Sequence, residues 1–276
     1  MFEIHQMATA VSDRNSKQQL ESAAIILDCR EHGESDLIVT FFCRHHGRLT
    51  GIAKGAKRSK KRFVNKLEIF TSLRIRHTIP KNNRLAFIAE AELVESFLTL
   101  RQDFLCYITA SIIREFTLLA THEMEGDEEL YPLLVWAFTS LDNGRPPRAI
   151  LILFLIRFYT AIGYSPQLHR CPDCSQEINE TETYTFFPAA GTIRCSICNK
   201  GKESNGSPLT LGTIRSLAAA QDQPLNRIHR LHLSRHCQKE ALTFLHHYGR
   251  QLFQREIISW SFLDTISPKG KRNKPQ

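Results

Sequence analysis

The chain has 276 residues, of which 42% are hydrophobic, so it is long enough for about two domains and too apolar to be a disordered protein. Its net charge of +8 favours an anionic partner. The most apolar run, residues 149–156, is far shorter than the roughly 18 residues that cross a membrane, which excludes a membrane-spanning class.

Residues 1–21 are polar and lack periodicity, and we expect them to form a flexible leader before a fold that begins near Ser22. They contain no secretory signal. The missing signal together with eight cysteines favours a reducing compartment, so we expect the protein in the cytoplasm. We expect no membrane partner.

Five short runs rich in Ile, Val, Phe and Thr follow, separated by turn signals. They span residues 23–29, 36–43, 48–54, 67–76 and 85–89. No stretch of helical length comes between them. Residues 22–92 are therefore predicted to form a small Greek-key barrel of the OB type, with a five-stranded SH3-like barrel as the alternative.

The basic excess of the chain lies in residues 44–84, which hold thirteen lysines and arginines and a single acid, Glu68. Residues 85–130 are acidic, so the two stretches either pair with each other or face different partners. Clustered cations suit a polyphosphate, because each one releases a condensed counterion on binding. We predict a nucleic-acid-binding surface here. Its candidate residues are Arg44, Arg48, Lys54, Lys57, Arg58, Lys60, Lys61 and Arg62.

Small and aromatic residues accompany these cations. Gly55 and Ser59 predict a mobile backbone that approaches another chain closely. Five phenylalanines flank the segment, and we expect most of them in the core, with one or two at most free to stack on unpaired bases. They are Phe41, Phe42, Phe63, Phe70 and Phe87. The alternatives are a merely solvated loop or an acidic membrane surface, although no basic amphipathic helix supports the latter.

After residue 93 the apolar residues recur at helical spacing, which predicts an all-α domain over residues 93–264. The expected helices span residues 97–119, 130–141, 146–163, 209–220 and 234–258. The third is apolar nearly all round, so we expect it at the centre of a bundle. Residues 265–276 are basic and rich in Pro and Gly, and are predicted to be a disordered tail.

Two Cys-x-x-Cys pairs, Cys171/Cys174 and Cys195/Cys198, lie within this domain. The spacing is typical of four thiolates around a structural zinc ion, Zn²⁺, which leaves no open position to activate water. The residues between the pairs predict a hairpin, so we expect a zinc-ribbon-like module over residues 169–200. His169 is an alternative ligand.

Other interpretations of the cysteines are weaker. A thioredoxin-like redox pair needs a βαβ context that is missing. His32 and Glu34 match half of a zinc-deaminase signature, but Arg170 stands where that signature has proline before its cysteine pair. Two unrelated pairs are the remaining alternative.

Two stretches, GESDLIVT at residues 33–40 and GRLTGIAKGAKRSK at residues 47–60, resemble the RecO family of bacterial DNA-repair and recombination mediators. The order of parts is similar too, from about Ser22 to Asp264. The resemblance implies an OB domain, a helical domain with a zinc module, and no enzymatic activity. It also implies contacts with phosphates by five of the candidate cations, which are Arg48, Lys54, Lys57, Arg58 and Lys60.

The partners that this resemblance implies are single- and double-stranded DNA, RecR, single-strand-binding protein and, indirectly, RecA. Such proteins anneal complementary strands and help RecA to load on coated DNA, at the nucleoid. The acidic, apolar C-terminal tail of single-strand-binding protein would dock in a groove of the helical domain, with Arg227, Arg230 and Arg235 as candidate rim residues. Two alternatives remain open: an RNA- or ribosome-associated OB protein with a zinc ribbon, and a zinc hydrolase or nuclease.

Overall fold

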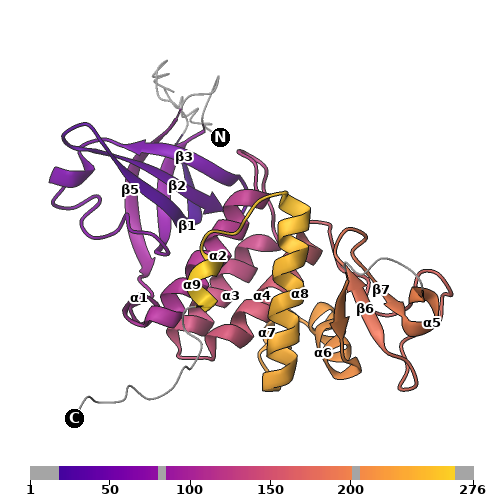
Figure 1. The fold of residues 1–276 in the computed structure, drawn as a ribbon. Coiled ribbons are helices and arrows are strands. Elements are labelled where there is room, and N and C mark those ends of the chain that lie inside the picture. The colour runs from indigo at the N-terminus through magenta and orange to yellow at the C-terminus, as the bar shows by residue number, and fades with distance from the viewer. Residues whose placement is uncertain (1–18, 80–84, 201–205, 265–276) are drawn as a thin grey trace, which may run out of the picture.

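The computed structural model describes residues 19–79, 85–200 and 206–264 (Figure 1). The predicted tail and most of the predicted leader lie outside these residues. The fold begins earlier than expected, because Gln19, Leu20 and Glu21 already belong to the first strand. In Figure 1 a strand-rich part lies at one end, the helices lie in the middle and a small hairpin lies at the far end.

The strand-rich part is a five-stranded closed barrel with the order β1-β2-β3-β5-β4. Its strands are β1 (Gln19–His32), β2 (Asp36–Cys43), β3 (Gly47–Ala53), β4 (Ser72–Thr78) and β5 (Ala86–Glu95). The neighbours are antiparallel except for β3 and β5, which run parallel. All five predicted strands are present, but β4 begins at Ser72 rather than at residue 67. Phe70 has a positive φ of 69°, which turns the chain just before the strand.

The helical part follows the predicted pattern with extra short pieces. Its helices are α1 (Leu98–Gln102), α2 (Phe104–Ala120), α3 (Leu130–Asp142), α4 (Pro147–Ala161), α6 (Leu211–Asp222), α7 (Leu225–Ile228), α8 (Arg235–Phe253) and α9 (Trp260–Asp264). The first predicted helix is split at Asp103, whose carboxylate accepts a hydrogen bond from the Cys106 N–H at 2.7 Å and caps α2. Helix α8 ends at Phe253 because Gln254 is left-handed, with φ 51°.

Helix α4 lies at the centre of the bundle, as its sequence predicted. It packs against α2, α3, α6 and α8. Residues 150–156 of its apolar run are all buried, and Ala149 is half-buried. The hydroxyl of Tyr159 donates to the Leu245 carbonyl at 2.7 Å, so the one polar group that this aromatic residue buries has a partner.

The barrel and the helices share one hydrophobic core. Ile25, Leu27, Phe42 and Phe70 of the barrel belong to the same buried cluster as the apolar faces of α2, α3 and α4. A second, smaller cluster fills the barrel itself. The barrel is therefore fixed on the helical body by apolar packing, and its orientation follows from the shape of that packing.

Three arginines fasten the same boundary through main-chain oxygens. Arg114 donates to the Leu27 carbonyl and pairs with Asp28 at 2.9 Å. Arg101 donates to the Ile69 carbonyl at 2.9 Å. Arg48 is the third, and its guanidinium donates to the Leu118 carbonyl of α2 at 2.8 Å. Charged donors to buried carbonyls make stronger bonds than neutral ones.

A close backbone contact adds to this boundary. The acidic turn of residues 122–129 lies against the β2–β3 turn and the start of β3, where the Met124 N–H donates to the Arg48 carbonyl at 3.0 Å. A Cβ on Gly47 would lie 1.7 Å from the Glu125 carbonyl oxygen, and one on Gly126 would lie 2.4 Å from that of His45. Only glycine fits at either position.

Part of the acidic stretch pairs with part of the basic one. On adjacent β4 and β5, Arg74 pairs with Glu92 at 3.3 Å, and Arg76 pairs with Glu90. Mutual neutralisation, one of the two alternatives for the segregated charges, thus accounts for these two arginines. This pairing does not account for the cations between β3 and β4.

One buried histidine makes barrel stability depend on pH. His77 lies between Ser22, 3.0 Å from its Nε2, and the Thr78 carbonyl oxygen, 3.1 Å from its Nδ1. Burial lowers its pKa from the ordinary 6.5, outweighing the opposing bond to Thr78. Because the unfolded chain then takes up the proton first, the stability from neutral His77 is complete above pH 6.5 and is lost as the pH falls.

We therefore predict that His77→Gln reduces the loss of unfolding free energy between about pH 7.5 and pH 5, relative to wild type. Urea denaturation at both pH values, followed by circular dichroism, measures the difference. Equal pH dependence in the two proteins would contradict the prediction.

Candidate nucleic-acid interface and metal centre

Residues 54–66 form a loop between β3 and β4, here called the cationic loop, which closes the end of the barrel that points away from the helices (Figure 1). Ala56 and Phe63 from this loop are buried in the barrel core. The Gly55 N–H donates to the Asp36 carboxylate at 2.8 Å, and the Lys57 N–H donates to the Ser35 carbonyl at 2.9 Å. The loop is therefore anchored along its length.

The two small residues expected to make this backbone mobile instead shape it. Gly55 adopts a positive φ of 67°, which starts the short 3₁₀ turn Ala56–Arg58. The hydroxyl of Ser59 accepts a hydrogen bond from the Phe63 N–H at 3.2 Å. Both features fix the path of the backbone from which the neighbouring cations project.

Six of the eight candidate residues lie on this loop, and all six are exposed. Arg62 donates to backbone carbonyls, whereas the side chains of the other five make no such bond among the described residues. These five loop cations are Lys54, Lys57, Arg58, Lys60 and Lys61. Among the residues that the structure describes, Lys54, Lys60 and Lys61 form no ion pair, whereas Lys57 lies 2.9 Å from Glu31 and Arg58 lies 3.5 Å from Glu34. Exposed pairs of this kind contribute little, so phosphate can replace the carboxylates.

The other three candidates lie differently. Arg44 is exposed, but it sits in the β2–β3 turn, at the opposite end of the seven-residue β3 from Lys54 and about 20 Å away. Arg48 is half-buried and holds the Leu118 carbonyl. Arg62 is exposed, yet its guanidinium donates to the carbonyls of Ala89 and Lys54, each at 3.2 Å.

The phenylalanines near the loop offer no stacking platform. Phe41, Phe42, Phe63 and Phe70 are all at least 97% buried, and Phe87 is half-buried. The expectation that most belong to the core is confirmed. This end of the barrel presents positive charge without exposed aromatic rings from this set, which suits a charged backbone better than unpaired bases.

The predicted hairpin of the cysteine module is present. Strands β6 (Tyr184–Phe187) and β7 (Thr192–Cys195) pair antiparallel, β8 (Ser207–Leu209) extends the sheet, and α5 (Ser196–Asn199) follows β7. Phe186 of the hairpin lies 4.2 Å from Phe244 of α8, ring centre to ring centre, so the module shares the helical core.

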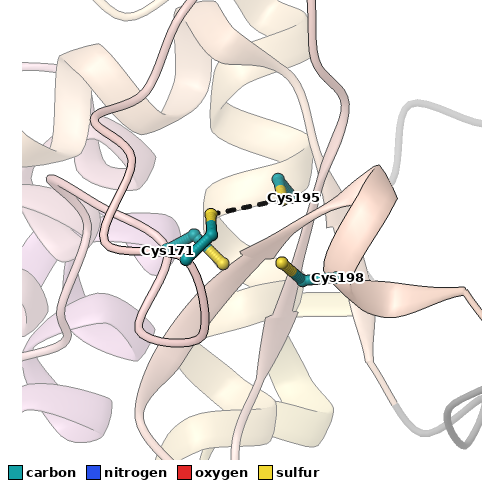
Figure 2. Close-up of side chains that lie close together, drawn as sticks. Cys171, Cys195 and Cys198 are labelled. Carbon is teal, nitrogen blue, oxygen red and sulfur yellow. Dashed lines mark hydrogen bonds between the residues drawn. The ribbon is translucent and has the colours of Figure 1, made fainter.

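The four cysteines point their sulfur atoms toward one another, as Figure 2 shows for Cys171, Cys195 and Cys198. All four Sγ atoms lie within 4.8 Å of one another, and those of Cys174 and Cys195 are 3.9 Å apart. Tetrahedral zinc with bonds of about 2.3 Å places its sulfur ligands about 3.8 Å apart. These four cysteines can therefore hold a metal ion. His169 lies outside the cluster, 3.9 Å from Asp222.

The thiols of the cluster differ in acidity. Burial disfavours the Cys171 thiolate, but backbone N–H groups of Cys195, Cys174 and Asp173 donate to its sulfur, and the pKa falls from 9.0 to about 7. The hydrogen bond to Cys195, with burial, raises the pKa of Cys198 to about 12. The Cys171 sulfur is thus prepared as an anion, whereas Cys198 needs a nearby cation to lose its proton.

A groove of about 890 Å³ runs along α8. Arg148, Arg235 and Lys239 supply positive charge, while Leu242, Trp260 and Leu263 supply apolar surface. We call this the docking groove. Of the three rim residues predicted, Arg235 lines it, and Arg227 and Arg230 do not. The i, i+4 spacing of Arg235 and Lys239 marks one helix face, but no local signal points to Arg148 or Trp260.

A barrel with a cationic end, fixed to a helical body that carries a cysteine tetrad, defines a class of protein suited to polyanions. No helix in the described part of the chain has the length and apolarity needed to span a bilayer. Family models for "Recombination protein O N terminal" and "Recombination protein O C terminal" match residues 18–97 and 101–260. The chain belongs to this family, whose members are DNA repair and recombination proteins.

Named relatives agree with the family models. The chain is similar to the DNA repair protein RecO of Syntrophobacter fumaroxidans, with 31% identity over 86% of this chain and 89% of the relative. The corresponding protein of Desulfatibacillum aliphaticivorans is 30% identical, over 89% and 96%. That of Syntrophus aciditrophicus is 27% identical, over 93% and 99%. The resemblance inferred from the sequence motifs is confirmed.

Removing a metal from the cysteine cluster should loosen the hairpin and the helices that share its core, because binding energy at such a site is folding energy. We expect a strong chelator, or Cys195→Ser, to expose residues 167–200 to limited proteolysis while the barrel fragment persists. Mass spectrometry of the fragments reads the outcome. An unchanged digestion pattern in metal-depleted protein would contradict a structural role.

Proposed function

We propose that this chain is a non-enzymatic mediator of DNA repair and recombination that binds single- and double-stranded DNA through the cationic loop. It grips the backbone without reading sequence, shields the charge of two strands and so speeds their annealing. In concert with RecR it helps RecA to load on DNA coated by single-strand-binding protein, in the cytoplasm at the nucleoid.

The observation that carries this proposal is the set of five loop cations, exposed together at one end of the barrel. Phosphate contacts of this kind release counterions and supply sequence-independent affinity. The strand order β1-β2-β3-β5-β4 supports assigning the barrel to the OB type, a fold that commonly binds oligonucleotides. Family membership supports DNA over RNA as the anion.

The cysteine cluster supports a structural zinc ion in a zinc-ribbon-like hairpin. Four thiolates would fill its coordination shell, leaving no position for water or substrate. The ion would brace the hairpin against α8 and take no part in chemistry. This donor set gives a zinc hydrolase or nuclease no support.

The docking groove supports a second binding site on this chain, for a protein partner. A C-terminal tail that is acidic and apolar matches a groove whose rim is cationic and whose floor holds Leu242, Trp260 and Leu263. We propose that the tail of single-strand-binding protein docks there. The groove lies on the helical body, so the tail and the DNA would occupy separate parts of one molecule.

The cationic loop can be tested by charge removal. Lys60→Ala/Lys61→Ala should weaken binding to single-stranded DNA about equally across sequences and reduce the salt slope of log K by about 0.7 per lost phosphate contact. Fluorescence anisotropy at several salt concentrations measures both. The matched control is Arg74→Ala/Arg76→Ala, which removes two cations already paired with Glu92 and Glu90. Equal effects of both pairs would refute the loop as the interface.

The docking groove can be tested by charge reversal. Arg235→Glu/Lys239→Glu should weaken binding of a fluorescent peptide with the tail sequence by more than about tenfold, because attraction to its acids becomes repulsion. Arg227→Glu/Arg230→Glu, on residues outside the groove, is the control. DNA affinity of the groove variant should stay within about twofold of wild type. Peptide binding that survives the reversal would exclude this groove.

A further inference from the structure

Lys66 ends the cationic loop and points back into it. Its ammonium group donates to three backbone carbonyl oxygens. They belong to Ala91 at 2.8 Å, Lys61 at 3.1 Å and Arg62 at 3.4 Å. An ammonium carries three N–H donors, so all of them have partners within the protein. Lys66 is also half-buried, which leaves it poorly placed to meet an external phosphate.

Arg62 uses its charge in the same way. Its guanidinium joins the Lys54 carbonyl, where the loop begins, to the Ala89 carbonyl of β5. It also lies over the ring of Phe63, 5.0 Å from the ring centre. The carbonyl of Arg62 in turn accepts from the Ala91 N–H at 3.3 Å. Both cations therefore tie the loop to β5.

We propose that Lys66 and Arg62 are positioning residues, which hold the cationic loop in a preformed shape so that the five loop cations meet phosphate without first being ordered. The inference rests on the proposed function of that loop. It divides the seven basic residues of the loop into two groups: five that face outward to the polyanion, and two that donate to backbone carbonyl oxygens of the loop and of β5.

Substitutions in the two groups should have different effects on the salt slope, which is the change of log K with the logarithm of salt concentration. A cation that contacts phosphate contributes to the number of counterions released, so its loss lowers the slope. A cation that only holds the loop releases none. Its loss lowers affinity because ordering the loop then opposes binding, but the remaining cations still reach the phosphates and the slope stays the same.

The experiment compares Lys66→Met with Lys60→Met in the full-length protein. Each variant removes one ammonium from the loop and keeps an unbranched side chain. Binding to a fluorescent oligothymidylate is measured by anisotropy at several salt concentrations. We expect Lys66→Met to lose about fivefold in affinity with an unchanged slope, and Lys60→Met to lower the slope by about 0.7.

Hydrogen–deuterium exchange of the DNA-free variants gives an independent readout. Lys66→Met should speed exchange in residues 54–66 and at the Ala91 amide, while Lys60→Met should not. If exchange rises but neither variant changes DNA binding, the positioning role stands and the proposed function of the loop fails. Unchanged exchange in Lys66→Met, or a slope reduced as in Lys60→Met, would overturn the positioning role.

Ser59→Ala is a second test of the inference if Lys66→Met fails to fold. It removes the bond from the Phe63 N–H to the Ser59 hydroxyl, a loop anchor without charge. The inference expects the same signature in milder form, with faster exchange, lower affinity and an unchanged slope. Arg62→Met and its neighbour Lys61→Met form a second matched pair, for which we expect the contrast seen between Lys66 and Lys60. A reduced slope in Arg62→Met would place that residue among the phosphate contacts instead.

Discussion

The fixed boundary between barrel and helices is the constraint on which the rest of the structure depends. Apolar residues of both parts form one core, and Arg48, Arg101 and Arg114 donate across the boundary to main-chain oxygens. Backbone carbonyls do not move with side-chain rotamers, so such bonds define an orientation as well as an energy. The cationic loop and the docking groove thereby keep a constant separation on the molecule.

Charge in this chain has three distinct uses. Some cations fasten the fold, as Arg114 and Lys66 do through carbonyl oxygens. Others balance acids across neighbouring strands, as Arg74 does with Glu92. A third group, the five loop cations, stays exposed at the barrel end. The net charge of +8 therefore overstates how many cations are available for binding, and position matters more than number.

Local patterns in the sequence predicted most of the elements, because strand alternation, helical periodicity and paired cysteines are each encoded within a few residues. The cysteine cluster was predictable since a short hairpin joins its two halves. The roles of Arg48 and Arg62 were not, because the Leu118 acceptor of Arg48 and the Ala89 acceptor of Arg62 lie 70 and 27 residues away along the chain. A basic segment looks uniform in sequence, and only tertiary contacts divide its members.

The facing glycines, Gly47 and Gly126, bring two main chains together without any side chain between them. An alanine at either position would act as a wedge at the rim of the joint, far from the cysteine tetrad and without altering any charge. A single methyl group at this contact would therefore change the angle between the two halves while the surfaces that they present stay chemically intact.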